Sequence, residues 1–208
     1  MTVVVGCGAP PPAAERDLYE EANVEFEAGN FDTATKNFSE LLEQYPFSDL
    51  AELARLRIAH AYYLNHEYEK AIAAFNDFER LHPTSPTLPF VGYTIGMSYL
   101  DQASTRDRDS SAAESALQQF QRVRNSYPDS LYARLAEFRI RQCEENLAGH
   151  ELFVGDYYAH NKKPAAARAR YEYVLSTYPR SDASVTAREK LNSMESTVGK
   201  APSFTKAD

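Results

Sequence analysis

The sequence contains no tryptophan and only two cysteines among its 208 residues. Two cysteines are too few for a disulfide framework or for a structural zinc site. No apolar run approaches the ~20 residues that a membrane-spanning helix requires. Basic residues are scarce relative to acidic ones, because 22 Lys and Arg face 30 Asp and Glu and leave a net charge of −8. A surface of that sign repels nucleic acid, so we expect no nucleic-acid partner.

The residues that are present are typical of a packed domain. Hydrophobic residues make up 43% and charged residues 25% of the sequence, both close to globular averages. The charge is unevenly divided: residues 15–82 carry 15 acidic and 6 basic side chains, whereas residues 131–191 carry 8 acidic and 10 basic ones. The two halves can therefore present surfaces of different charge to different partners.

A short motif of Tyr or His, Pro, any residue and Ser occurs four times. In each copy an alanine precedes the Pro by 12 positions, an aromatic residue by 8 and an apolar residue by 5. Proline ends the helix before it and the following Ser can cap the next one, so each motif marks a boundary between helices. The prolines are Pro46, Pro83, Pro128 and Pro179, the alanines Ala34, Ala71, Ala116 and Ala167, and the aromatic residues Phe38, Phe75, Phe120 and Tyr171.

This spacing predicts pairs of antiparallel helices that cross closely where both carry small side chains. The aromatic residue lies one turn after the alanine and fills the space beside the crossing. The pattern is that of tetratricopeptide repeats, which stack into a superhelix with an open concave face. The small residues expected opposite the alanines, in repeat order, are Ala22, Ala59, Gly96 and Gly155.

We therefore predict an all-α fold, an α-solenoid of about five tetratricopeptide-like helix pairs over residues 15–195. The polar segment 104–111 is expected to be a loop inserted in the third repeat. The long interval between the last two prolines accommodates an additional helix. The helices expected in the C-terminal half span 130–148, 149–161, 164–177 and 181–195, which brings the total to about ten.

The segment before the repeats, residues 1–14, contains Val4-Val5-Gly6-Cys7 followed by a Pro- and Ala-rich stretch that favours an extended tether. The first four of these residues are similar to a bacterial lipobox, in which the cysteine carries lipid. A signal peptide needs a basic start and an apolar stretch of ~7–15 residues, and only six residues precede Cys7. Two interpretations stay open: a lipobox remnant with lipidation at Cys7, or an ordinary terminus with an incidental cysteine. Residues 196–208 are predicted to form a polar tail.

No catalytic constellation is evident. The five histidines lack metal-ligand spacing, and there is no nucleophile elbow, P-loop or dinucleotide fingerprint. Cys143 is expected to be a half-buried structural thiol. Adjacent carboxylates such as Glu20 and Glu21 point in different directions on a helix and cannot act as one acid–base pair. We therefore predict no enzyme activity, no metal and no cofactor, and binding is the expected activity.

In such arrays the first helix of each pair lines the concave face. The N-terminal repeats offer aromatic side chains there, and these favour binding of a peptide with an aromatic end. The alternative for each of these residues is packing between repeats. The fourth pair, with Leu152, Asp156 and Ala159, predicts a poorer pocket. The groove residues are Tyr19, Phe26, Tyr63 and Tyr93, with Asn23, Leu56, His60, Met97 and Leu100 beside them.

From about residue 15 to 190 the chain resembles the BamD family of outer-membrane-assembly lipoproteins, also called ComL or YfiO. Its third-repeat insertion separates this family from generic tetratricopeptide proteins. The motifs that carry the resemblance are Gln44-Tyr45-Pro46-Phe47, Ala61-Tyr62-Tyr63, Pro83-Thr84-Ser85-Pro86, Phe90-Val91-Gly92-Tyr93, Arg106-Asp107-Arg108-Asp109, Asp156-Tyr157-Tyr158 and Tyr178-Pro179.

The resemblance implies a non-catalytic scaffold on the periplasmic face of the outer membrane, held there by a lipid on Cys7. It implies as partners the periplasmic domains of the barrel-forming BamA, unfolded β-barrel precursors that end in an aromatic residue, and accessory lipoproteins. Arg170 occupies the position of a family arginine that pairs with BamA. Arg168 is expected to be solvated or bound within the array. The C-terminus is shorter than in enterobacterial members, which leaves the accessory contacts open.

A second hypothesis is a soluble periplasmic tetratricopeptide adaptor of a cell-envelope or division complex, with Cys7 unmodified. Genomic sequence upstream of Met1 discriminates the two, because an in-frame basic and then apolar segment favours the lipoprotein. A third hypothesis, an enzyme with an unrecognised site, lacks convergent polar groups to support it.

Overall fold

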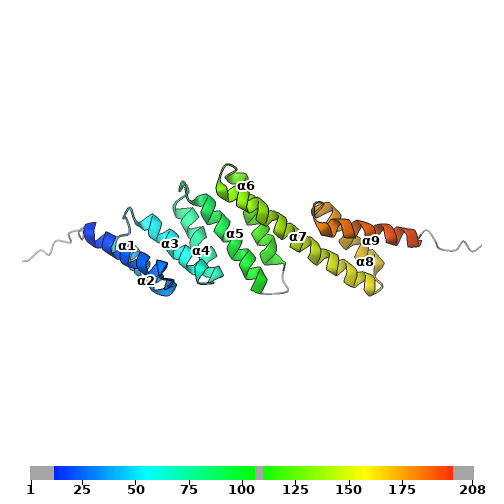
Figure 1. The fold of residues 1–208 in the computed structure, drawn as a ribbon, viewed down its shortest axis with the longest axis horizontal. Helices are drawn as coiled ribbons and strands as arrows, with labels where there is room; N and C mark the ends of the chain where they lie inside the picture. Colours follow the sequence, from blue (N-terminus) through cyan, green and yellow to red (C-terminus); the bar gives the residue numbers. More distant parts are fainter. Residues whose placement is uncertain (1–11, 106–109, 199–208) are drawn as a thin grey trace, which may run out of the picture.

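The computed structural model describes residues 12–105 and 110–198. Within these residues the chain forms nine helices and no strand, stacked one after another along an elongated body (Figure 1). The predicted all-α solenoid is confirmed. Cys7 and most of the predicted polar tail lie outside the described residues. The helices are α1 (Pro12–Glu27), α2 (Phe31–Gln44), α3 (Ala51–Leu64), α4 (Tyr68–Leu81), α5 (Leu88–Thr105), α6 (Ser111–Ser126), α7 (Leu131–His160), α8 (Pro164–Thr177) and α9 (Asp182–Val198).

Small residues sit at the helix crossings, in the register that the sequence predicts. Ala34, Ala71 and their counterparts in α6 and α8 are fully buried. A Cβ atom added at Gly96 would lie 2.6 Å from the ring of Phe120, so no larger residue fits at this crossing. Each crossing is closed by the aromatic residue one turn later, and these four rings are among the largest fully buried side chains. The repeated spacing therefore builds a continuous core along the solenoid.

Three of the turns within helix pairs contain a residue with a positive φ angle. Gly29, His66 and Lys162 adopt φ values of 80°, 60° and 56°, in the left-handed region. Each lies five positions before the buried alanine of its second helix, and the next residue donates its N–H to a carbonyl in the last turn of the first helix. A left-handed residue at this point reverses the chain within a few residues and satisfies helix-end carbonyls.

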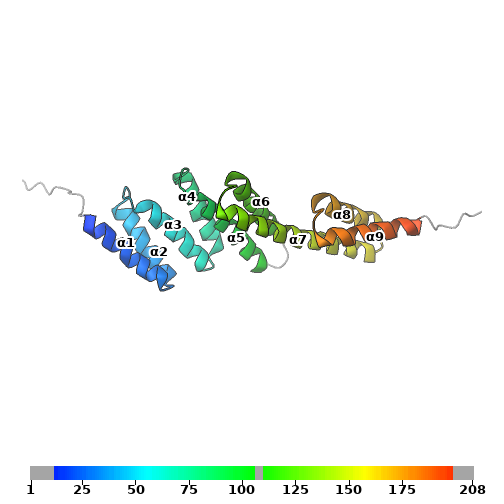
Figure 2. The same ribbon diagram turned by 45° about the horizontal axis from the view of Figure 1, so that its top comes forward.

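The C-terminal half differs from the predicted arrangement, because α7 is one continuous helix of 30 residues. We expected two helices, with a break near residues 148 and 149. No proline interrupts this stretch, and Gly149, at the expected break, costs only about 1 kcal/mol in a helix interior. One end of α7 packs against α5 and α6, and the other against α8 and α9 (Figures 1 and 2). The described part of the chain therefore holds nine helices rather than about ten.

Cys143 lies in the middle of α7 and is fully buried, where we expected half-burial. It belongs to the core cluster around Phe120 and Ile140. Burial raises the pKa of its thiol to about 11, Arg139 opposes that shift and Glu144 adds to it. A thiol in this state is a poor nucleophile, in agreement with a structural role.

Candidate functional site

Five aromatic rings from the first helices of successive pairs touch in sequence along the solenoid. The ring centroids of Phe26 in α1 and His60 in α3 are 5.6 Å apart, and His60 lies 5.3 Å from Phe90 in α5. Phe90 lies 5.6 Å from Tyr132 in α7, which lies 5.7 Å from Tyr93 in α5. We call these five residues the aromatic ladder. It joins four first helices, so the N-terminal repeats share one apolar surface rather than separate pockets.

Cationic groups flank the ladder at both ends. The guanidinium of Arg57 lies 4.6 Å from the centroid of the Phe26 ring, and the Nε of Arg139 donates to the Tyr93 hydroxyl at 3.4 Å. Burial lowers the pKa of His60, with Arg57 lowering it further and Glu27 opposing the shift. The imidazole is therefore neutral near pH 7 and behaves as another apolar ring of the ladder.

The structure places three of the four predicted groove residues in or beside the ladder. Phe26 and Tyr93 are members of it, and the Tyr63 ring stacks beside His60 at 6.4 Å between centroids. The Tyr63 hydroxyl donates to Asp101 at 3.0 Å, and burial together with that carboxylate raises its pKa. Phe26 is only 7% exposed, so its role in packing between repeats is substantial.

Tyr19, the fourth predicted groove residue, lies elsewhere. Its ring packs against Phe38 of α2 at 5.4 Å, inside the first helix pair. Three residues that sequence reasoning missed complete the surface: Phe90, Tyr132 and Arg57. Their contacts run between helices of different repeats, and a motif repeated within each pair carries no signal for such contacts.

Arg170 and Arg168 are both paired within the solenoid. The Nη1 of Arg170 in α8 donates to Glu151 in α7 at 2.8 Å, while 43% of the arginine side chain stays exposed. The Nη1 of Arg168 lies 3.8 Å from Glu172 and 3.3 Å from Glu195. Arg168 is bound within the array, in agreement with the prediction. Arg170 keeps further N–H donors for a partner, since a guanidinium carries five.

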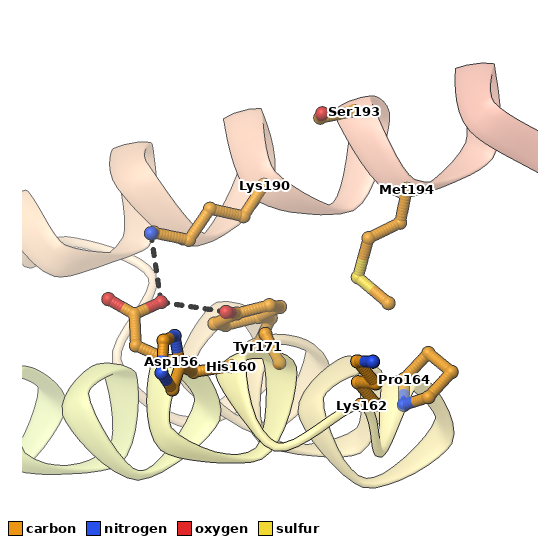
Figure 3. Close-up of a pocket in the computed structure, with 9 residues that line it drawn as sticks. Asp156, His160, Lys162, Pro164, Tyr171, Lys190, Ser193 and Met194 are labelled. Carbon is orange, nitrogen blue, oxygen red and sulfur yellow. Dashed lines mark hydrogen bonds and ion pairs between the residues drawn. The ribbon is translucent and has the colours of Figure 1, made fainter.

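The C-terminal repeats hold a pocket that the sequence did not predict. Its volume is about 820 Å³, and it opens between the end of α7, the start of α8 and α9 (Figure 3). Asp156 stands at its wall, where its Oδ1 accepts from the Tyr171 hydroxyl at 2.7 Å and pairs with the Lys190 ammonium at 2.8 Å. From the fourth helix pair alone we expected a poorer pocket. The pocket is larger than expected because Lys190, Ser193 and Met194 of α9 supply a wall that no single helix pair predicts.

Asp156, Tyr171 and Lys190, one from each of the three helices around this pocket, interact with one another. Burial alone would raise the pKa of Asp156, but hydrogen bonds from Lys190 and Tyr171 hold it below its ordinary value. Burial also raises the pKa of Tyr171, as does the neighbouring carboxylate of Asp156. The three groups therefore form a charged hydrogen-bonded unit at neutral pH, and their main effect is to fix α9 against α7 and α8.

Residues 12–105 and 110–198 contain no group of three or more His, Cys, Asp or Glu side chains placed to hold a metal ion. Over the same ranges, none of the helices combines the length and apolar character needed to cross a membrane. The features that stand out in the described residues are the aromatic ladder and the pocket at Asp156.

Comparison with known proteins gives a consistent picture. A family model described as YfiO, outer membrane lipoprotein, matches residues 11–201. The outer membrane protein assembly factor BamD of Vibrio cholerae is 28% identical over 205 residues, covering 92% of this chain and 84% of that protein. BamD of Neisseria meningitidis serogroup B is 32% identical over 171 residues, covering 77% of this chain and 64% of that protein. Relative to the Neisseria protein, this chain therefore spans slightly less than two thirds of the length.

Among solved structures, the TPR2AB domain of yeast Sti1 in complex with pHSP90 is similar in fold. The TM-score is 0.50 at 18% sequence identity, and the match covers 81% of this chain and 66% of that chain. At this identity the similarity concerns the tetratricopeptide architecture alone.

Proposed function

The chain belongs to the YfiO family of outer membrane lipoproteins, and we propose that it is a non-catalytic scaffold in outer membrane protein assembly. In this proposal the solenoid lies on the periplasmic face of the outer membrane, anchored by a lipid on Cys7. The N-terminal repeats bind unfolded β-barrel precursors and the C-terminal repeats bind periplasmic domains of BamA. The observation that carries the proposal is the aromatic ladder, an apolar surface that the N-terminal repeats share.

The ladder supports precursor binding because four of its five rings are half-buried and keep accessible edges. Burial of one further aromatic ring on such a surface contributes ~1.5–3 kcal/mol. Asp101 beside Tyr63 and the guanidinium groups of Arg57 and Arg139 offer polar partners to the backbone of an extended peptide. A short amphipathic strand with an aromatic end matches this combination of apolar rings and flanking polar groups.

Arg170 supports BamA binding in a different way. Its exposed guanidinium is held in place by Glu151, so little side-chain entropy is lost when a partner carboxylate approaches. A guanidinium binds a carboxylate through two parallel hydrogen bonds, which gives both affinity and orientation. Arg168 lacks this freedom, because it already faces Glu172 and Glu195.

Site-specific crosslinking tests precursor binding. A photoreactive residue in place of Tyr63 or Tyr93 should capture a peptide with the sequence of a β-barrel C-terminus, and replacement of its terminal aromatic residue by Ala should reduce capture. Tyr173, an exposed tyrosine on α8, is the matched control position. Capture that occurs solely from Tyr173, or that ignores the terminal aromatic residue, would contradict the assignment of the groove.

A further inference from the structure

The outward face of α7 carries a row of apolar side chains that no part of the described chain covers. At 100° per residue these side chains fall within an arc of about 100°, opposite the face buried against α6. Phe138 is 58% exposed and Phe153 is 69% exposed, although both are large apolar residues. The row extends for about 39 Å at 1.5 Å per residue. Its exposed members are Leu131, Leu135, Phe138, Phe153 and Tyr157, and we call it the α7 stripe.

Gly149 lies in the α7 stripe between Phe138 and Phe153, and no contact with the described residues requires a glycine there. Gly92, Gly96 and Gly155 each face a side chain that would lie 2.5–2.8 Å from an added Cβ atom. At Gly149 a Cβ atom would meet nothing within 4 Å. A glycine in a helix interior is destabilising by about 1 kcal/mol relative to alanine. Because glycine has no side chain, the backbone of a second helix can approach α7 closely at this point, as it does at small residues in helix crossings.

The charges beside the N-terminal part of the stripe are basic. Arg134, Arg139 and Arg141 flank Leu135 and Phe138, and none of the three guanidinium groups pairs with a carboxylate in the described part of the chain. Arg139 donates instead to Gln142 at 2.9 Å and to a tyrosine hydroxyl. A partner that covers this part of the stripe is therefore favoured if it carries acidic side chains beside its apolar ones.

We propose that the α7 stripe binds an acidic amphipathic helix of a partner protein, with its apolar side chains against Phe138 and Phe153 and its backbone crossing near Gly149. This surface is distinct from the one assigned to Arg170, because Glu151, which holds Arg170, lies on the opposite side of α7. The inference thus adds a further interaction surface to the scaffold and stands independently of the function proposed above.

A helix fits the stripe better than a bilayer surface does. Gln142 and Asn146 interrupt the apolar row between Phe138 and Phe153. A membrane-bound amphipathic surface would bury these polar amides at the acyl boundary, at the cost of removing them from water. A partner helix can place polar side chains opposite them and still fill the apolar contacts on either side.

The absence of tryptophan from the sequence allows a site-specific test. Single-tryptophan variants Phe138→Trp and Phe153→Trp replace exposed rings, as does the control Phe47→Trp at the turn before α3, where the ring is 98% exposed. The probe is a synthetic helix of about 25 residues, long enough to follow the stripe, with leucine on one face and glutamate beside it. It should shift the emission of the first two variants to the blue in a saturable and salt-sensitive manner, and leave the control unchanged.

Matched changes at Gly149 complete the test. Gly149→Ala should raise Tm, because alanine favours the helix. Gly149→Gln should also leave the fold intact, yet weaken peptide binding by about tenfold, as expected for an overpacked crossing. Equal shifts at Phe47→Trp, or equal affinity for a peptide with lysine in place of glutamate, would overturn the proposal. It would also be overturned if phosphatidylglycerol vesicles, or increased protein concentration alone, shifted the emission where the peptide did not.

Discussion

The Nη1 of Arg170 lies 2.8 Å from a carboxylate oxygen of Glu151 and so joins α8 to the long helix α7. The arginine is therefore positioned before any partner arrives. Because the pair leaves part of the guanidinium exposed, a partner carboxylate can bind without displacing Glu151. Arg168, two residues earlier, points away and is engaged by acids of α8 and α9.

Arg170→Leu should strongly weaken binding to the periplasmic domains of BamA. Loss of one member of a desolvated ion pair costs about 2 kcal/mol or more, which corresponds to at least tenfold in affinity. Co-purification and titration with the isolated domains measure the effect, and circular dichroism checks helical content. Arg168→Leu is the matched control and should have a small effect on binding. If the two variants bind equally well, Arg170 is not the contact.

Cys7→Ser tests lipid anchoring. One acyl chain holds a protein only weakly at a membrane, whereas two or three hold it stably, at ~0.8 kcal/mol for each buried methylene. When expressed behind a complete signal peptide, the unchanged protein should sediment with membranes and the variant should be released. Equal sedimentation of both proteins would show that another feature provides the anchor, and release of both would favour a soluble adaptor.

Ala71→Leu should destabilise the solenoid, because Ala71 is fully buried at the crossing of α3 and α4. Overpacking of such a site costs ~1–3 kcal/mol, which thermal or urea unfolding detects. Ala73→Leu makes the same chemical change two residues away on the exposed face of α4 and should leave Tm nearly unchanged. A similar loss of stability in both variants would contradict the register of the repeats.

His60→Phe should reduce the dependence of stability on pH below neutrality. The pKa of His60 in the folded chain lies below the ordinary value of 6.5, since burial opposes the charged form. As pH falls below about 6.5, the unfolded chain takes up a proton before the folded chain does, so stability decreases. Between pH 7 and 5.5 the unchanged protein should therefore lose more Tm than the variant, which keeps an apolar ring in the ladder. Parallel curves would show that His60 titrates normally.

The sequence was sufficient to predict the repeated part of the fold. Ala34, Phe38 and Leu41 of α2 are all fully buried, and so are their counterparts in the other three copies. The spacing 12, 8 and 5 before each proline selects residues on one helix face, and close packing then requires that face to be buried. The continuity of α7 escaped prediction, because the end of a helix depends on a breaker or on competing contacts, and a lone glycine is a weak breaker.

The candidate surfaces were predicted less completely, because they are made between repeats. Tyr63 and Tyr93 were identified as first-helix aromatics, and the structure brings both to the ladder. Tyr19 fits the same description in the sequence but packs into its own helix pair. The pocket at Asp156 depends on α9, which follows α7 by more than twenty residues and has no fixed spacing to it. Such contacts depend on how successive pairs rotate against each other, which local patterns do not encode.

A single helix shared by both halves has a mechanical consequence. Two short helices joined by a turn could bend at that turn. The 30 residues of α7 instead form one continuous helix about 45 Å long, with no break in it. The helices α5 and α6 pack against one end of α7, and α8 and α9 pack against the other. A partner bound to the N-terminal repeats and one bound to the C-terminal repeats would therefore be kept at a fixed distance and orientation, and a displacement of one end of α7 would move the other end with it.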